Sequence, residues 1–269
     1  MSKLVAYCFN ILVYICIAFA AILPVFFLIL LSFSKGWIWP HIIPNTNQLR
    51  AWTYVLSNTS GTMKALSTSV QIACCVVIVN IAIALPAGNA FGRYSFKGKA
   101  IYEAILLAPI VIPPVLVMMG MHKTFIKLGL TESITGVILA HMIPTLPYMI
   151  RSLTIAYKHL GFDWEEQAKV LGAGKLKRFL YVIFPFLLPG IIAGTSLTIL
   201  ISLSEYAATL LIGGGGVVTL SILMFPFVNG GDQSIGAAYS LLFAAVAILV
   251  LIILDLFLKH YYSEKKIFK

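Results

Sequence analysis

The sequence predicts an all-α membrane protein, a polytopic bundle of six transmembrane helices. Of its 269 residues, 60% are hydrophobic and only 10% are charged. The mean hydropathy of +0.98 lies far above the range of soluble globular proteins. The apolar runs are about 20 or more residues long, which is the length of a spanning helix, whereas a membrane β-strand needs only ~10.

Six apolar segments follow one another along the chain, separated by polar or glycine-rich intervals. Four consecutive glycines, Gly213 to Gly216, mark the end of the fifth segment. The third and fourth contain prolines, which are tolerated in a bundle because neighbouring helices satisfy the freed carbonyl groups. The expected spans are residues 4–33, 65–91, 100–121, 134–157, 184–212 and 234–258.

We expect a single membrane domain with three parts. Residues 1–64 hold the first transmembrane helix and an outer loop. Residues 65–258 form a five-helix core that includes a polar loop at 157–183. Residues 259–269 form a basic tail.

The positive charge follows the membrane topology. With the N-terminus inside, the expected cytoplasmic parts carry 14 of the 19 lysine and arginine residues, and the outer loops carry the other 5. By the positive-inside rule, both termini and the loop at 157–183 are cytoplasmic. The net charge of +10 is therefore assigned to the membrane surface, and no nucleic-acid partner is expected.

The loop after the fourth segment has a defined local pattern. Asp163 and Glu166 have the Asp-x-x-Glu spacing of a capping box, which predicts a helix start. Gly172 is expected to end this helix, because glycine accepts the left-handed conformation at a helix C-terminus. A second helix, basic at first and apolar afterwards, then re-enters the bilayer from Lys175.

This loop resembles the EAA loop of ABC importer permeases. Glu166, Ala168 and Gly172 match the pattern E-A-A-x-x-x-G, and Pro185 follows 13 residues after the glycine, as in that family. Gln167 departs from the pattern, since the family usually has its first alanine there. An ordinary cytoplasmic loop, whose acidic residues offset nearby lysines, is the alternative. The full spacing within a chain of six spans favours the family.

The resemblance is to type I ABC importer permeases and covers roughly residues 65–258, which implies their MetI-like fold. In that family two permeases form the pathway, two cytoplasmic ATPases dock on the EAA loops, and an extracellular binding protein delivers the substrate. Related members work as heterodimeric or fused pairs, so the second permease is expected to be a different chain. Five residues are expected to contact the ATPase: Asp163, Glu166, Ala168, Gly172 and Ala173.

No catalytic signature accompanies these features. The sequence contains no P-loop, HExxH, CxxC or GxSxG pattern, and its four cysteines lie in apolar runs without metal-ligand spacing. We therefore expect a transport subunit rather than an enzyme, with no cofactor or metal on this chain. ATP and Mg²⁺ are expected on the partner ATPase.

A second group of candidates lies in the fifth span. An ionisable side chain such as Glu205 is costly at this depth and is expected to face the bundle interior or water. Ser202, Tyr206 and Thr209 share its helical face, so the four are expected to line the translocation path. The alternative is that Glu205 bonds to another helix and stabilises the bundle. His141, the one histidine inside a span, is expected to make an interhelical hydrogen bond.

Two parts of the outer surface have open assignments. The glycine run and Asp232 are expected outside the membrane, either as a contact for a substrate-delivery protein or as a flexible connector. Both functions fit a glycine-rich interval equally well.

Together these features predict a permease subunit of an ATP-driven importer in a bacterial inner membrane, in contact with lipid. It would carry a small charged solute that a binding protein delivers. Residues 90–99 and 205–213 resemble the subgroup that handles polyamines, thiamine, ferric iron, phosphonates and sulfate. An ion-coupled secondary transporter is the alternative, but Glu205 alone gives it thin support.

Overall fold

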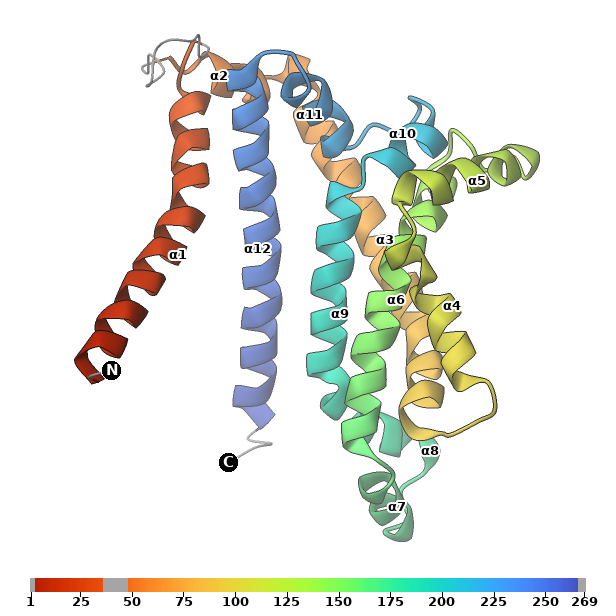
Figure 1. The fold of residues 1–269 in the computed structure, drawn as a ribbon. Helices are drawn as coiled ribbons and strands as arrows, with labels where there is room; N and C mark the ends of the chain where they lie inside the picture. Colours follow the sequence, from red (N-terminus) through yellow and green to blue (C-terminus); the bar gives the residue numbers. More distant parts are fainter. Residues whose placement is uncertain (1–2, 36–47, 266–269) are drawn as a thin grey trace. The chain divides into compact units, whose positions relative to one another are not determined.

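The computed structural model describes residues 3–35 and 48–265. These residues form helices joined by short connections, without a β-strand (Figure 1). The expected all-α architecture is confirmed. Within the predicted outer loop and basic tail, residues 36–47 and 266–269 lie outside the described part of the chain.

The chain divides into two compact units, each formed by two stretches of sequence. The first unit comprises Met1–Met63 and Leu223–Val246, and the second comprises Lys64–Ile222 and Ala247–Lys269. The elements of the first unit are α1 (Lys3–Ser32), α2 (Arg50–Leu56), the 3-10 helix η1 (Asn58–Ser60), most of α11 (Leu220–Val228) and the first part of α12 (Gln233–Lys265).

Hydroxyl groups join the distant segments of the first unit. The Ser34 and Ser234 hydroxyls lie 3.1 Å apart, and those of Thr62 and Tyr239 lie 2.9 Å apart. All four residues are buried. Such pairs hold helices together in an apolar environment, where an unpaired hydroxyl would be costly.

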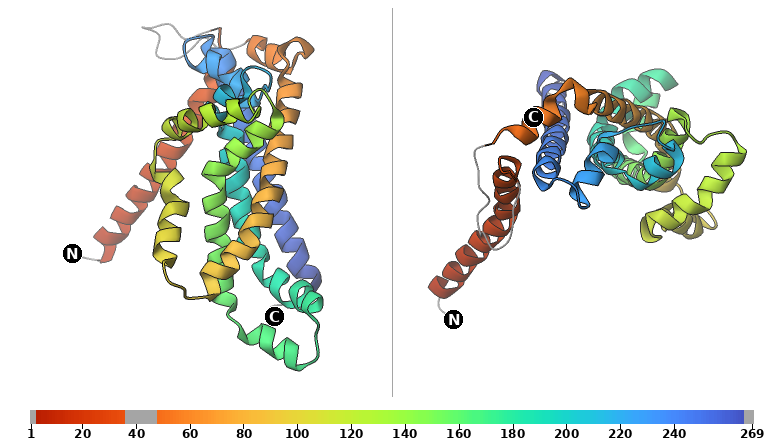
Figure 2. Two further views of the ribbon diagram at one scale, coloured as in Figure 1. Left: turned by 90° about the vertical axis from the view of Figure 1, so that its right-hand side faces the viewer. Right: turned by 90° about the horizontal axis from the view of Figure 1, so that it is seen from above.

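The second unit holds the remaining helices, whose polar loop and helix breaks carry the candidate sites. In Figures 1 and 2, α7 and α8 lie at one end of this unit and α5 and α10 lie towards the other. Its elements are α3 (Thr62–Arg93), α4 (Lys99–Val111), α5 (Pro114–Lys127), α6 (Ile134–Leu160), α7 (Asp163–Val170), α8 (Lys175–Arg178), the π-helical η2 (Phe179–Ile183), α9 (Phe184–Ser204), α10 (Ala207–Gly213) and the end of α12.

Two apolar clusters form the core of the second unit. One includes Val76, Val137 and Ile212, and joins α3, α6 and α10. The other includes Leu153 and Leu187, and joins α6 to α9 nearer the end that carries α7. Burying these side chains against one another fixes the helices around α6.

Small residues bring α3 and α6 into close contact. A Cβ atom on Gly88 would lie 2.7 Å from Cβ of Leu153, and one on Gly92 would lie 2.7 Å from the carbonyl oxygen of Thr154. Glycines four residues apart on one helix allow this approach, because they form a flat strip along one face. The end of α3 is therefore fixed against the end of α6.

Several described helices have the length and composition of membrane spans. By these criteria α3, the continuous helix Lys175–Ser204 and α12 can each cross a membrane, and the bent pair α4–α5 gives a fourth crossing if it counts as one span. In α1 the described side chains give a shorter apolar stretch, Ile22–Ser32. The expected total of six spans stays a prediction.

The third expected span, which contains three prolines, is divided into two helices. The axis bends by 102° between α4 and α5. Ile112 and Pro113 at the bend have extended ψ angles of 133° and 127°. Two successive prolines cause this break, because a residue that precedes proline is disfavoured in the helical region.

The fourth expected span is a continuous helix despite its two prolines. α6 includes both Pro144 and Pro147. Next to the first proline, the hydroxyl of Thr145 donates to the carbonyl of His141 at 2.7 Å, which adds a side-chain hydrogen bond to the backbone of this turn.

We predict that Gly92→Ala destabilises the chain by about 1–3 kcal/mol, because the added methyl group overlaps the α6 backbone. Gly120→Ala is the matched control, since its Cβ atom would meet nothing within 4 Å. Thermal unfolding of the purified chain in detergent measures both. Equal melting temperatures for Gly92→Ala and the parent chain would contradict the close α3–α6 contact.

Candidate functional site

The loop that resembles an EAA loop folds as a short helix with a closed end. Gly172 follows α7 with φ of +82° and donates to the carbonyl of Lys169 at 3.0 Å. Ala173 donates to the carbonyl of Ala168 at 3.0 Å. These two bonds form a Schellman motif, so the prediction that Gly172 ends this helix is confirmed.

The predicted capping box at the start of α7 is wrong. The N-cap residue is Phe162, and no side-chain hydrogen bond caps the helix. The Phe162 ring packs edge-on against Tyr94, with ring centroids 5.5 Å apart, and the Phe162 carbonyl accepts the first helical hydrogen bonds. Asp163 therefore lies inside the first turn, where its charge with those of Glu165 and Glu166 complements the helix dipole.

The outer surface of this loop is unusually apolar. Val170 and Leu171 are 87% and 86% exposed, and Trp164 and Leu176 are also largely exposed. Large apolar side chains gathered in one loop and exposed to this degree indicate a site of interaction with another molecule. We call the set Trp164, Glu166, Gln167, Val170, Leu171 and Leu176 the outer loop face.

The five predicted ATPase-contact residues differ in exposure. Asp163, Glu166 and Gly172 are exposed, whereas Ala168 and Ala173 are half-buried. The first three are therefore accessible to a partner. The two alanines lie closer to the rest of the chain.

Pro185, the distant member of the motif, has a structural position. It is buried as the second residue of α9, which follows the π-helical η2. Its ring removes a backbone donor, and a widened π turn accommodates the loss without ending the helix. The carbonyl of Pro185 accepts a hydrogen bond from the Tyr262 hydroxyl at 2.9 Å.

Glu205 does not lie in a continuous helix, which corrects the prediction for the fifth span. α9 ends at Ser204 and α10 begins at Ala207. The Glu205 carboxylate accepts a hydrogen bond from the N–H of Ala208 at 3.0 Å. Glu205 thus satisfies a free donor at the start of α10, as a capping side chain does.

His141 joins the two sides of this helix break. Its Nδ1 lies 2.9 Å from the Ser202 hydroxyl, and its Nε2 lies 2.9 Å from the Thr209 hydroxyl. All three residues are buried. The expected interhelical hydrogen bond of His141 is confirmed, and it has two partners.

The hydrogen-bond directions assign a tautomer to His141. The Thr209 hydroxyl donates to the Glu205 carbonyl at 2.9 Å, so it accepts from Nε2–H of the imidazole. The Ser202 hydroxyl then donates to Nδ1. The assignment is a neutral ring with its proton on Nε2.

A polar contact that sequence reasoning missed extends this network to α3. The side-chain amide of buried Asn80 donates to Thr145 at 2.8 Å, and Thr145 donates to the carbonyl of His141. Within the described residues, the amide oxygen of Asn80 and the hydroxyl of Thr198 are buried without a partner. The sequence feature that could have identified this contact is the position of Asn80 and Thr145, two polar residues near the middle of apolar runs.

The four predicted path residues therefore separate into two pairs. Ser202 and Thr209 meet at His141, whereas Glu205 and Tyr206 form the connection between α9 and α10. They do not form one face of one helix. The bond of Glu205 to Ala208 is local, three residues along the chain, so the path and the interhelical assignments of Glu205 both stay predictions.

The glycine run and Asp232, which the sequence analysis expected outside the membrane, make defined contacts. Within the glycine run, Gly216 donates to the carbonyl of Gly213 at 2.8 Å, and Val217 beside it is buried in the core. Asp232 forms an ion pair with Arg50 and accepts from the N–H of Ser234 at 3.1 Å. The two assignments of these elements, a contact for a substrate-delivery protein or a connector, stay predictions.

These contacts change the acidity of Asp232. Partial burial alone would raise its pKa, but the hydrogen bonds from Arg50 and from the start of α12 together hold the pKa of Asp232 below its ordinary value. The stabilisation is therefore present at neutral pH and is lost as the pH falls through this lowered pKa.

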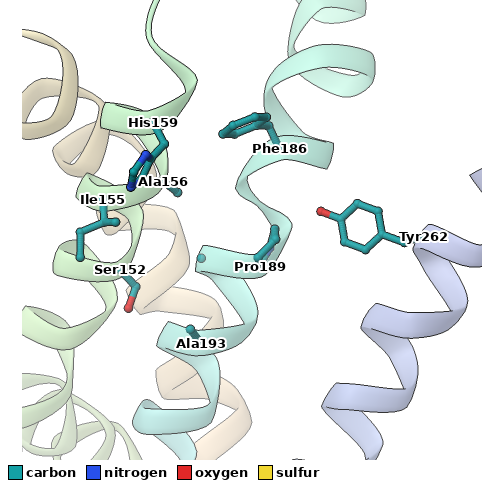
Figure 3. A pocket seen from close by; sticks show the side chains of 9 residues that line it. Ser152, Ile155, Ala156, His159, Phe186, Pro189, Ala193 and Tyr262 are labelled. Atoms are coloured by element: carbon teal, nitrogen blue, oxygen red, sulfur yellow. The ribbon is translucent and has the colours of Figure 1, made fainter. Parts of the chain in front are cut away.

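A cavity of about 400 Å³ opens beside α6 and α9 (Figure 3). Small and apolar side chains line most of it, including Ala156, Pro189 and Ala193, with His159 and Tyr262 at its edges. None of the loop or path candidates lines this cavity. Among the described residues, no group of three His, Cys, Asp or Glu side chains has the arrangement of a metal site.

Comparison with known proteins agrees with the helical fold. A sequence model of the family described as "Binding-protein-dependent transport system inner membrane component" matches residues 81–267. A bacterial ABC transporter involved in the import of the acidic polysaccharide alginate has a similar fold, with a TM-score of 0.70 at 15% identity over 100% of this chain and 99% of that chain.

Curated relatives are transport permeases. The molybdenum transport system permease protein ModB of Escherichia coli K12 is 30% identical over 194 residues, which cover 64% of this chain and 85% of ModB. The probable sulfate transport system permease protein cysT of Helicosporidium is 27% identical over 61% of this chain and 66% of its own. The molybdate/tungstate permease protein WtpB of Pyrococcus abyssi is 29% identical over 56% and 60%.

The fold and the apolar helices define a multi-pass membrane transport protein. The chain belongs to the family of binding-protein-dependent transport system inner membrane components, and it is a permease subunit of an ABC importer. This membership decides against an ion-coupled secondary transporter as the alternative.

We predict that Thr209→Val destabilises the chain by about 1–3 kcal/mol, because the Nε2–H of His141 and the carbonyl of Glu205 lose their partner. Thr209→Ser keeps the hydroxyl and is expected to retain most of the stability. Thr68→Val is the matched control. It removes a hydroxyl that donates to the Lys64 carbonyl at 3.0 Å and that lies outside the His141 network. Thermal unfolding of the purified variants compares the three, and equal losses for both Thr→Val changes would contradict the network.

Proposed function

We propose that this chain forms half of the translocation path of an importer and couples it, through the outer loop face, to a separate ATPase. The observation that carries this proposal is the exposed apolar surface on a short helix closed by Gly172. Val170 and Leu171 are about nine-tenths exposed, and exposure of such apolar side chains to water is unfavourable. Covering them with another protein surface therefore lowers the free energy.

The charge distribution supports an intracellular position for this loop. The expected cytoplasmic parts hold most of the lysine and arginine residues, as the positive-inside rule requires. Both termini are then inside. An ATPase in the cytoplasm reaches α7 only in this orientation, and it supplies the site for ATP and Mg²⁺.

A second permease completes the path in this proposal. The loop resembles that of importers in which two permeases pair, and related members use two different chains. We propose the same assembly here, with two ATPase subunits and an extracellular binding protein. The family description itself names dependence on a binding protein.

The proposed substrate is a tetrahedral oxyanion of the molybdate or sulfate class. The names of three relatives refer to molybdenum, molybdate/tungstate and sulfate transport. The contact of Glu205 is compatible with an anion, because its carboxylate caps α10 and its charge is partly offset there by the helix dipole. A polyamine would instead need several free carboxylates.

Uptake measurements test the substrate class. Cells that carry the chain with its neighbouring transport genes are expected to accumulate radiolabelled molybdate in a way that depends on ATP and that excess sulfate or tungstate inhibits. Deleting the chain is expected to abolish this uptake. Uptake of spermidine that depends on the chain, with molybdate uptake unchanged by the deletion, would contradict the oxyanion proposal.

We predict that Gly172→Ala weakens association with the ATPase, because a Cβ atom at φ of +82° strains the end of α7. The expected destabilisation of the helix end is about 1 kcal/mol, or roughly fivefold in affinity. Recovery of a protein with a Walker A motif, on mild-detergent purification of the tagged chain from its own membranes, measures the association.

Gly174→Ala is the matched control for this experiment. Gly174 lies two residues away, its Cβ atom would also meet nothing within 4 Å, and its φ of −67° suits any residue. Equal recovery of the ATPase with both variants would contradict coupling through the shape of this helix end. Failure of the parent chain to recover an ATPase would contradict the coupling proposal itself.

A further inference from the structure

Arg93, the last residue of α3, is a buried cation beside α7. Its side chain is 3% exposed, and its Nη1 donates to the carboxylate of Glu165 at 2.8 Å. Glu165 lies in the first turn of α7 and its side chain is 24% exposed. A charge-assisted hydrogen bond of this kind is stronger than a neutral one. Because the pair is largely buried, salt in the solvent screens it less than it screens an ion pair on the surface.

Aromatic rings hold the guanidinium in place. Its central carbon lies 5.1 Å from the ring centroid of Tyr157 in α6 and 5.0 Å from that of Phe162. A planar guanidinium suits this position because it can stack on rings while its edge bonds a carboxylate. Arg93 thus contacts α6, α7 and the residue that joins them.

The part of α3 that carries Arg93 is itself fixed. Gly92, directly before it, lies against the backbone of α6, where a Cβ atom would be 2.8 Å from Cβ of Tyr157. By contrast, the covalent link between α6 and α7 is short and bent: α6 ends at Leu160, and the next residue, Gly161, has φ of 62° and ψ of −152°. Arg93 therefore gives α7 a non-covalent connection to the bundle in addition to the covalent link.

α7 has two functional sides. Glu166 and Val170 belong to the exposed outer loop face, whereas Glu165 points to Arg93. A single helix of eight residues moves as one body, so a force applied to one side is delivered at the other. Figure 1 shows α7 at the same end of the second unit as the last turns of α3 and α6.

The contact with Glu165 does not satisfy all the hydrogen-bond donors of Arg93. Within the described part of the chain, Nε and Nη2 of Arg93 are buried without an acceptor. Each unsatisfied buried donor is costly, so the contact is weaker than a fully paired network. Loss of Glu165 would leave the cation uncompensated, which makes the pair sensitive to movement of α7.

We propose that the Arg93–Glu165 pair is a latch that transmits movement of α7 to α3 and α6. Arg93 is then a positioning residue for the coupling of ATP hydrolysis to transport. The inference rests on the proposed function, because it takes the outer loop face to be the side on which the ATPase acts.

The first test uses the purified full chain without a partner. Glu165→Gln is expected to raise amide hydrogen exchange across α7 roughly tenfold, the change expected from losing one charge-assisted hydrogen bond. The double variant Arg93→Glu with Glu165→Arg is expected to restore part of the protection. Lys97→Gln, at an exposed lysine in the turn after α3, is the matched control and is expected to leave exchange unchanged.

The second test uses the complex with its co-purified ATPase. MgATP is expected to change exchange in α7 and in the last two turns of α3 of the parent chain. With Glu165→Gln, the ATPase is expected to co-purify and the change in α7 to persist, while the change in α3 is lost. A variant that folds poorly is recognised by raised exchange throughout α6, and the double variant Arg93→Glu with Glu165→Arg, which restores an opposite charge beside the buried cation site, then replaces Glu165→Gln in the comparison.

The outcomes separate the latch from the proposed function. Unchanged exchange of α7 in Glu165→Gln, or an undiminished response of α3 to MgATP, would overturn the latch. Loss of the ATPase with Glu165→Gln would also overturn it, since Glu165 would then be a docking residue. A parent complex whose α7 does not respond to MgATP would overturn the proposed function and the coupling role with it, whereas the first test would still report the contact.

Discussion

A break in a membrane helix frees backbone groups that lipid cannot satisfy, and the second unit depends on how its side chains meet this constraint. At the break between α9 and α10, the carboxylate of Glu205 accepts the N–H of Ala208, and the hydroxyl of Thr209 donates to the carbonyl of Glu205. His141 then joins Ser202 and Thr209 across the gap. Without these bonds the break would expose several polar groups to an apolar environment.

The same unit holds a different kind of connection at its other end. There, glycines place α3 directly on α6, and a buried cation links both helices to the polar loop. The hydrogen-bonded break and the packed glycine contact have different structural roles. The hydrogen-bonded break permits an irregular backbone within the bundle. The glycine contact fixes α3 and α6, the two helices that would receive movement from a partner.

Sequence reasoning reached the fold class, the helical segments and the end of α7, because hydropathy and glycine conformation are local properties. It failed where packing decides. The break at Glu205 depends on contacts between helices, and the apolar pattern continues across it. The bend at Ile112–Pro113 has a local cause in two successive prolines, but hydropathy does not give its angle. The N-cap was misplaced by one residue because the Phe162 ring packs on Tyr94, a contact that spacing does not reveal. Asn80 and Arg93 acquire partners only in three dimensions.

The central claim is that the outer loop face meets an ATPase. Photo-crosslinking from a benzophenone side chain placed at Val170, in intact native membranes, tests it most directly. The account predicts an adduct with a protein that carries a nucleotide-binding motif, and no such adduct from the same group at Ile126, an exposed position in α5. Equal adducts from both positions, or adducts from Val170 with lipid alone, would contradict it.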